Sequence, residues 1–155
     1  MSGDRRRAVA LVIEAQRRGV PLVDLYVEVL LASQAHVGRL WQADEATIAE
    51  EHAVTAATEL AMGQLFVAAT RAPSLGVLVI AGGIAGDLHD LGVRAAADLL
   101  DIAGFDVIFI GTDIPPADFA RAAEDYEALV VLIGATRASN LDRVRDDGGR
   151  RSPDP

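Results

Sequence analysis

The stretch Gly86-Asp87-Leu88-His89-Asp90-Leu91-Gly92 lies between an apolar run, residues 75–82, and a helical pattern, residues 93–100. An apolar run followed by a loop and an amphipathic helix predicts one unit of a parallel α/β sheet, in which ligands bind at the carboxyl ends of the strands. We therefore expect His89 at that edge. Because Asp87 precedes it by two residues, the imidazole can offer one ring nitrogen to a metal while the carboxylate fixes its tautomer. One His cannot hold a bare metal ion, so the metal should arrive with its other ligands.

The pattern D-x-H-x-x-G after a strand resembles the cobalamin-binding domain shared by methionine synthases, corrinoid proteins, mutases and some light sensors. The resemblance implies that His89 replaces the vitamin's own benzimidazole as the lower ligand of cobalt. It also implies that Asp87 is the hydrogen-bond partner of His89 and that Gly92 lets the next helix pass close to the displaced tail. Thr136 stands where this family often has a Ser or Thr near the tail, although a residue at a strand end needs no function.

Composition excludes several classes of protein. The chain has no Cys, which rules out disulfides, zinc–thiolate sites and a Cys nucleophile, and no Lys, which removes Schiff-base and P-loop roles. A net charge of −9 and a pI of about 4.7 have the wrong sign for a surface that collects phosphates, so we expect no direct binding to nucleic acid. No apolar run approaches the length of a membrane span. A cytoplasmic protein that does not enter the membrane is the expectation.

The first half of the chain has the apolar periodicity of helices. Intervals of three and four residues predict helices over residues 4–18, from residue 22 to 41 or 42, and over about 46–70. Asp44 and Thr47 are alternative N-caps for the third helix, and Thr47 with Glu50 has the form of a capping box. Pro73 marks a boundary, so residues 1–72 are expected to form a helical cap domain, a bundle.

After this boundary apolar strands alternate with amphipathic helices. The pattern predicts strands over residues 75–81, 106–110 and 128–133, and helices over about 90–103 and 116–127. This alternation favours a doubly wound parallel α/β sheet. Gly82 and Gly83 are expected to permit a tight turn before the His loop, and Asp90 is expected to cap the helix that follows.

The resemblance further implies a flavodoxin-like domain with strand order 2-1-3-4-5. Because the sequence contains only the first three of those strands, we expect residues 73–141 to form a shortened, incomplete cobalamin-binding domain, and the chain to be truncated at its C-terminus. Residues 142–155 have the composition of a disordered tail.

Trp41 and the pair Glu51-His52 lie on either side of the short connection between the second and third predicted helices. In an antiparallel helix pair, residues equally far from the turn stand level, so these side chains should meet at one end of the bundle. The spacing resembles the helical cap of the light-sensing, adenosylcobalamin-dependent regulators of the CarH type, in which the Trp and the Glu-His pair contact the adenosyl group. We expect no DNA-binding region before this cap.

Three functions remain open. The preferred hypothesis is a cobalamin-binding sensor, not itself an enzyme, that prefers adenosylcobalamin, responds to light and acts through homo-oligomerisation or a partner regulatory protein. The second is a corrinoid methyl carrier for a methyltransferase system, with methylcobalamin as its cofactor. Sensor is preferred over carrier because methyl carriers generally replace the Trp and Glu-His pattern by other residues. The third is an interaction module that no longer binds cobalamin and presents its last strand to a partner.

Overall fold

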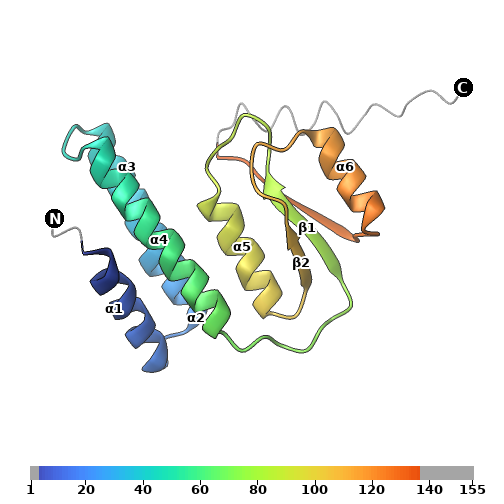
Figure 1. Ribbon diagram of the computed structural model, residues 1–155, viewed down its shortest axis with the longest axis horizontal. Coiled ribbons are helices and arrows are strands. Elements are labelled where there is room, and N and C mark those ends of the chain that lie inside the picture. The colour runs from blue at the N-terminus through green and yellow to red at the C-terminus, as the bar shows by residue number, and fades with distance from the viewer. Residues whose placement is uncertain (1–3, 137–155) are drawn as a thin grey trace, which may run out of the picture. The chain divides into compact units, whose positions relative to one another are not determined.

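The computed structural model of the chain describes residues 4–136 and divides, between Thr70 and Arg71, into a helical unit and an α/β unit (Figure 1). The boundary expected at Pro73 lies close to this division. The expected tail and residues 137–141 lie outside the described residues. Within residues 4–136, no helix combines the length and the apolar character that a membrane span requires.

The helical unit consists of α1 (Arg5–Arg17), α2 (Leu22–Asp24), η1 (Leu25–Leu31), α3 (Ala32–Gln42) and α4 (Ile48–Ala68). The carboxylate of Asp4 caps α1 by accepting a hydrogen bond from the Arg7 amide at 3.0 Å. Thr47 caps α4 in a complete capping box with Glu50, because each side chain accepts a hydrogen bond from the other residue's amide. Asp44, the alternative cap, lies instead in the preceding turn with a φ of 57°.

The second predicted helix is present from Leu22 to Gln42, but one segment of it is not an α-helix. In η1 the hydrogen bonds follow the wider π-helical pattern, which periodicity alone does not reveal. Tyr26 is completely buried in this segment, and its hydroxyl donates to the Met62 carbonyl oxygen of α4 at 3.2 Å. This hydrogen bond ties η1 to α4.

The α/β unit consists of β1 (Leu78–Gly83), α5 (Leu91–Ile102), β2 (Asp106–Phe109), α6 (Pro116–Asp125) and β3 (Val130–Gly134). The three strands are parallel in the order β2-β1-β3, so β1 is central. Helix α5 connects β1 to β2, and α6 connects β2 back across β1 to β3. Because these two connections run in opposite directions along the sheet and both are right-handed, α5 and α6 cover opposite faces of the sheet (Figure 1). The predicted fold class, a helical cap followed by a shortened doubly wound parallel sheet, is confirmed.

Gly82 and Gly83 do not form the tight turn expected from the sequence, because they are the last residues of β1. Both glycines allow the loop after β2 to approach closely. A Cβ added to Gly82 would lie 2.8 Å from the Gly111 carbonyl oxygen, and one added to Gly83 would lie 2.8 Å from the Thr112 methyl carbon. Glycine at these two positions therefore allows the loop after β2 to pack directly against the end of β1.

The segment before β1 is hydrogen-bonded to the rest of the α/β unit without being a strand. Strand β1 begins at Leu78, where pairing with β2 begins, and not at residue 75. The Arg71 guanidinium contacts the carboxylates of Asp101 at 3.2 Å and Asp106 at 2.6 Å, and it donates to the Phe105 carbonyl oxygen at 2.8 Å. Ser74 donates to the second Asp106 oxygen at 2.7 Å. Backbone hydrogen bonds from Ala72 to Ile102 and from Leu75 to Gly104, both 2.8 Å, continue this attachment.

Candidate functional site

The loop after the central strand carries the predicted His at the carboxyl edge of the sheet. Gly86 adopts a φ of +81°, and the Asp87 amide donates to the Ile84 carbonyl oxygen at 3.1 Å, so the chain turns sharply here. Asp90 occupies the N-cap position of α5 as predicted, but its side chain makes no capping hydrogen bond.

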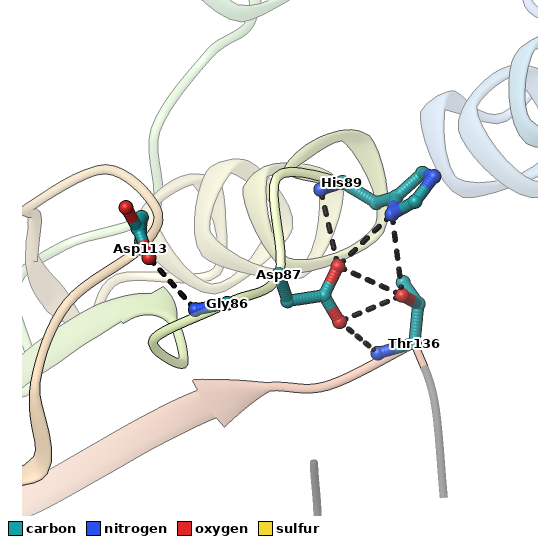
Figure 2. Close-up of polar contacts among 5 residues, drawn as sticks. All are labelled: Gly86, Asp87, His89, Asp113 and Thr136. Atoms are coloured by element: carbon teal, nitrogen blue, oxygen red, sulfur yellow. Dashed lines mark hydrogen bonds and ion pairs between the residues drawn. The ribbon is translucent and has the colours of Figure 1, made fainter. Parts of the chain in front are cut away.

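Asp87 and His89 are brought together as the sequence predicted (Figure 2). His89 Nδ1 lies 3.0 Å from Asp87 Oδ1, and the His89 amide donates to the same oxygen at 3.2 Å. Asp87 is buried, at 2% exposure, whereas the imidazole is 68% exposed. A carboxylate at Nδ1 favours the tautomer with the proton on that nitrogen, which leaves a lone pair on the outward-facing Nε2.

Thr136, for which the sequence left two interpretations open, contacts the other side of the Asp87 carboxylate. Its amide donates to Oδ2 at 2.5 Å, and its hydroxyl lies 2.8 Å from Oδ1 and 2.6 Å from Oδ2. Burial by itself raises the pKa of Asp87, but the hydrogen bonds from Thr136 and His89 outweigh burial and hold that pKa well below its ordinary value. The carboxylate behind His89 therefore remains charged.

Asp113 also belongs to this edge; the sequence places the segment from Gly111 to Pro115 there but assigns Asp113 no role in the site. Its Oδ1 accepts a hydrogen bond from the Gly86 amide at 2.7 Å (Figure 2). The position of this segment in the sequence pointed to the site, because residues 111–115 follow β2 and so lie at the same edge of the sheet as His89.

Gly92 lies in the first turn of α5, and a Cβ added there would meet nothing within 4 Å. This open position agrees with the expectation that a ligand group passes the helix at Gly92, and that role stays a prediction.

In the helical unit, Glu51 and His52 form the predicted pair, with His52 Nδ1 2.6 Å from Glu51 Oε2. Gln34 and Thr55, which the sequence analysis missed, hold the other Glu51 oxygen at 2.6 Å and 3.0 Å. The contact of Thr55 could have been predicted from the sequence, because residues four positions apart are neighbours on a helix. Trp41 lies in the last turn of α3 and is 46% exposed.

The donor set of the α/β unit fits a metal that arrives already ligated. Within residues 4–136, no group of three His, Cys, Asp or Glu side chains could hold a bare metal ion. The exposed His89 with a charged partner would offer one ligand to the cobalt of a corrin, whose ring supplies the others.

Comparison with known proteins gives matches over both units. A model described as a B12 binding domain matches residues 1–66, and another with the same description matches residues 76–147. The chain is 28% identical over 144 residues to trimethylamine corrinoid protein 1 of Methanosarcina mazei, covering 89% of this chain and 65% of that protein. It is 30% identical over 146 residues to dimethylamine corrinoid protein 3 of Methanosarcina acetivorans, covering 92% and 67%. The chain thus spans about two thirds of the length of these relatives.

Among solved structures, the monomethylamine corrinoid protein of Methanosarcina barkeri has the same fold. The TM-score is 0.75 at 22% identity, and the match covers 92% of this chain and 76% of that chain. These relatives are corrinoid proteins, so the comparisons favour the second of the three hypotheses over the light-sensing regulator that the sequence analysis preferred.

Proposed function

This chain belongs to the family of B12-binding corrinoid proteins, and we propose that it is a methyl carrier that serves partner methyltransferases. Cobalamin is its cofactor. The carrier role is supported by the relatives, which are trimethylamine and dimethylamine corrinoid proteins, and a methylated amine is accordingly the methyl source that we propose. The observation that carries the proposal is the exposed imidazole of His89, held through Nδ1 by the buried Asp87 at the carboxyl edge of a parallel sheet.

The carrier replaces the light-sensing regulator as the leading hypothesis. The ordered Glu51-His52 pair keeps the regulator as the alternative, because that pair was the reason for preferring it. Contacts of Trp41, Glu51 and His52 with the upper face of the cofactor stay predictions, as does the preference for adenosylcobalamin. Homo-oligomerisation, a regulatory partner and a cytoplasmic location also stay predictions.

Bound cobalamin supplies a cobalt atom that accepts a methyl group from one substrate and gives it up to another. His89 would hold this atom through Nε2. Asp87 would keep the proton on Nδ1 and so leave the lone pair of Nε2 available for the metal. Thr136 would keep Asp87 oriented and ionised through its amide and hydroxyl. Gly92 would leave space for the displaced tail.

The test is reconstitution with methylcobalamin and with adenosylcobalamin, in the dark and under green light, with His89→Ala as the variant. We expect the wild-type chain to bind methylcobalamin with the absorption spectrum of a His-ligated corrinoid, and His89→Ala to lose that spectrum. His36→Ala is the matched control, because His36 is an exposed histidine of α3 with no role in the proposed site and should leave the spectrum unchanged.

Other outcomes would contradict the proposal. A change in molecular mass when the adenosylcobalamin complex is illuminated would restore the light-sensing regulator. An identical spectrum for wild type and His89→Ala would exclude His89 as the ligand, and failure to bind either cofactor would favour the interaction module.

A further inference from the structure

The loop after β2 is built against the end of β1 and the start of the His loop. The Gly83 amide donates to the Gly111 carbonyl oxygen at 2.9 Å, and the Ala85 amide donates to that of Ile114 at the same distance. The Ile114 amide returns a hydrogen bond of 3.0 Å to the Gly83 carbonyl oxygen. Backbone bonds thus fix this loop at the point where the chain enters the turn that carries His89.

Asp113 has a backbone conformation that most residues avoid. Its φ of 60° lies in the left-handed region, where Asp and Asn are enriched among residues other than glycine. In this conformation its carboxylate reaches the Gly86 amide, 27 positions away in the sequence, at 2.7 Å (Figure 2). The hydrogen bond is charge-assisted, the stronger kind of amide contact.

The His loop is therefore held from both sides of the central strand. Asp113, from the loop after β2, holds Gly86, while Thr136, just after β3, holds Asp87. We propose that Asp113 is a positioning residue for His89: it fixes the start of the loop and so presents the imidazole already oriented for cobalt. This inference rests on the proposed cobalamin site and adds a residue to which no role in that site was assigned above.

The geometry predicts what each substitution at this position does. Asp113→Gly removes the acceptor and keeps the left-handed backbone without strain, and it also gives the loop more backbone freedom. Both changes should loosen the start of the His loop. Asp113→Asn keeps an acceptor oxygen and tolerates the same φ, so it should restore most of the function. Asp118→Asn, in the first turn of α6, is the control for loss of a nearby negative charge.

Two measurements test the proposal, one without cofactor and one with it. Without cobalamin, we expect hydrogen exchange at the Gly86 amide to be about tenfold faster in Asp113→Gly than in wild type. With bound methylcobalamin at one fixed pH, the ratio of His-ligated to unligated absorption should fall about tenfold in Asp113→Gly. The ratio should stay within about threefold of wild type in Asp113→Asn and be unchanged in Asp118→Asn.

The outcomes separate this inference from the proposed function. If His89→Ala leaves the spectrum of the bound cofactor unchanged, the cobalamin site itself is wrong. If His89→Ala changes the spectrum but Asp113→Gly matches wild type in both measurements, the positioning role is overturned. An equal fall in the ratio of His-ligated to unligated absorption in Asp113→Gly and Asp118→Asn would also overturn the positioning role, because the loss of one negative charge would then account for the effect.

Discussion

The Thr136 hydroxyl and amide both contact the Asp87 carboxylate, and their hydrogen bonds lower the pKa of a carboxyl group that burial would otherwise raise. The unfolded chain has an ordinary carboxyl pKa of about 3.9 at this residue. Because the folded pKa is lower, the ionised Asp87 stabilises the fold above about pH 4. That contribution is lost as the pH falls from there towards the folded pKa.

Thr136→Val removes the hydroxyl but keeps the amide and the shape of the side chain. We expect it to lower the free energy of unfolding of the cofactor-free chain by about 1–2 kcal/mol at pH 7. The difference in free energy of unfolding between wild type and Thr136→Val should become smaller as the pH falls below about 4, because the hydroxyl stabilises protonated Asp87 less than ionised Asp87. Urea unfolding at several pH values measures this. Thr112→Val is the control, and a gap that stays constant with pH would contradict the assignment.

At the residue scale, the sequence predicted the contact within the His loop but not the contacts that other segments make with that loop. Asp87 and His89 were found because two residues in one turn must lie close together. Thr136 remained undecided and Asp113 was missed, because each meets the His loop across a strand pairing that a single sequence does not specify. Gln34 was missed for a similar reason, since it reaches Glu51 from the neighbouring helix.

Among the elements, the turn between α5 and β2 depends on one glycine. Gly104 has a φ of +102°, and a Cβ there would lie 2.5 Å from the Pro73 carbonyl oxygen. We expect Gly104→Ala to destabilise the α/β unit by about 1–3 kcal/mol, because both the backbone and the segment before β1 must shift. Protection of the β1 amides against hydrogen exchange is the measurement.

Gly92→Ala is the matched control for this substitution. It lies in α5 of the same unit, where an added methyl group meets nothing. Its effect on the cofactor-free chain should be neutral or stabilising, by up to about 1 kcal/mol. Equal losses of hydrogen-exchange protection in both variants would show that the close contact of residue 104 with the Pro73 carbonyl oxygen is not the cause of the destabilisation.

The elements themselves were largely readable from the sequence. Periodicity and capping gave α1 and α4, since Asp4 and Thr47 act through local hydrogen bonds. The bounds of β1 were wrong at both ends, because Leu78 is where pairing with β2 begins and because two glycines continue the strand. The π-helical hydrogen bonds of η1 leave no comparable pattern in the sequence.

For the whole molecule, the last described strand has an unpaired edge. Among residues 4–136, β3 pairs with β1 alone, and Leu129, Val130 and Val131 are 74%, 44% and 38% exposed. No charge or proline interrupts this strand, so it lacks the features that keep edge strands from pairing with other chains. We expect this chain of 155 residues to self-associate as its concentration rises.

Val131→Lys should weaken that association by putting a charge on the edge. Light scattering over a concentration series measures it. Val67→Lys is the matched control, because Val67 is 84% exposed on α4 and far from any strand in the sequence. Equal suppression by both lysines would point to net charge as the cause and not to the strand.

The two attachments of the His loop give two remote routes to the imidazole that we propose as the ligand of cobalt. In the proposed carrier role, a partner that displaced Asp113 or Thr136 would change the orientation of His89 without contacting the imidazole. Two different partners could thus act on the same imidazole independently, one through the Asp113–Gly86 hydrogen bond and the other through the contacts of Thr136 with Asp87.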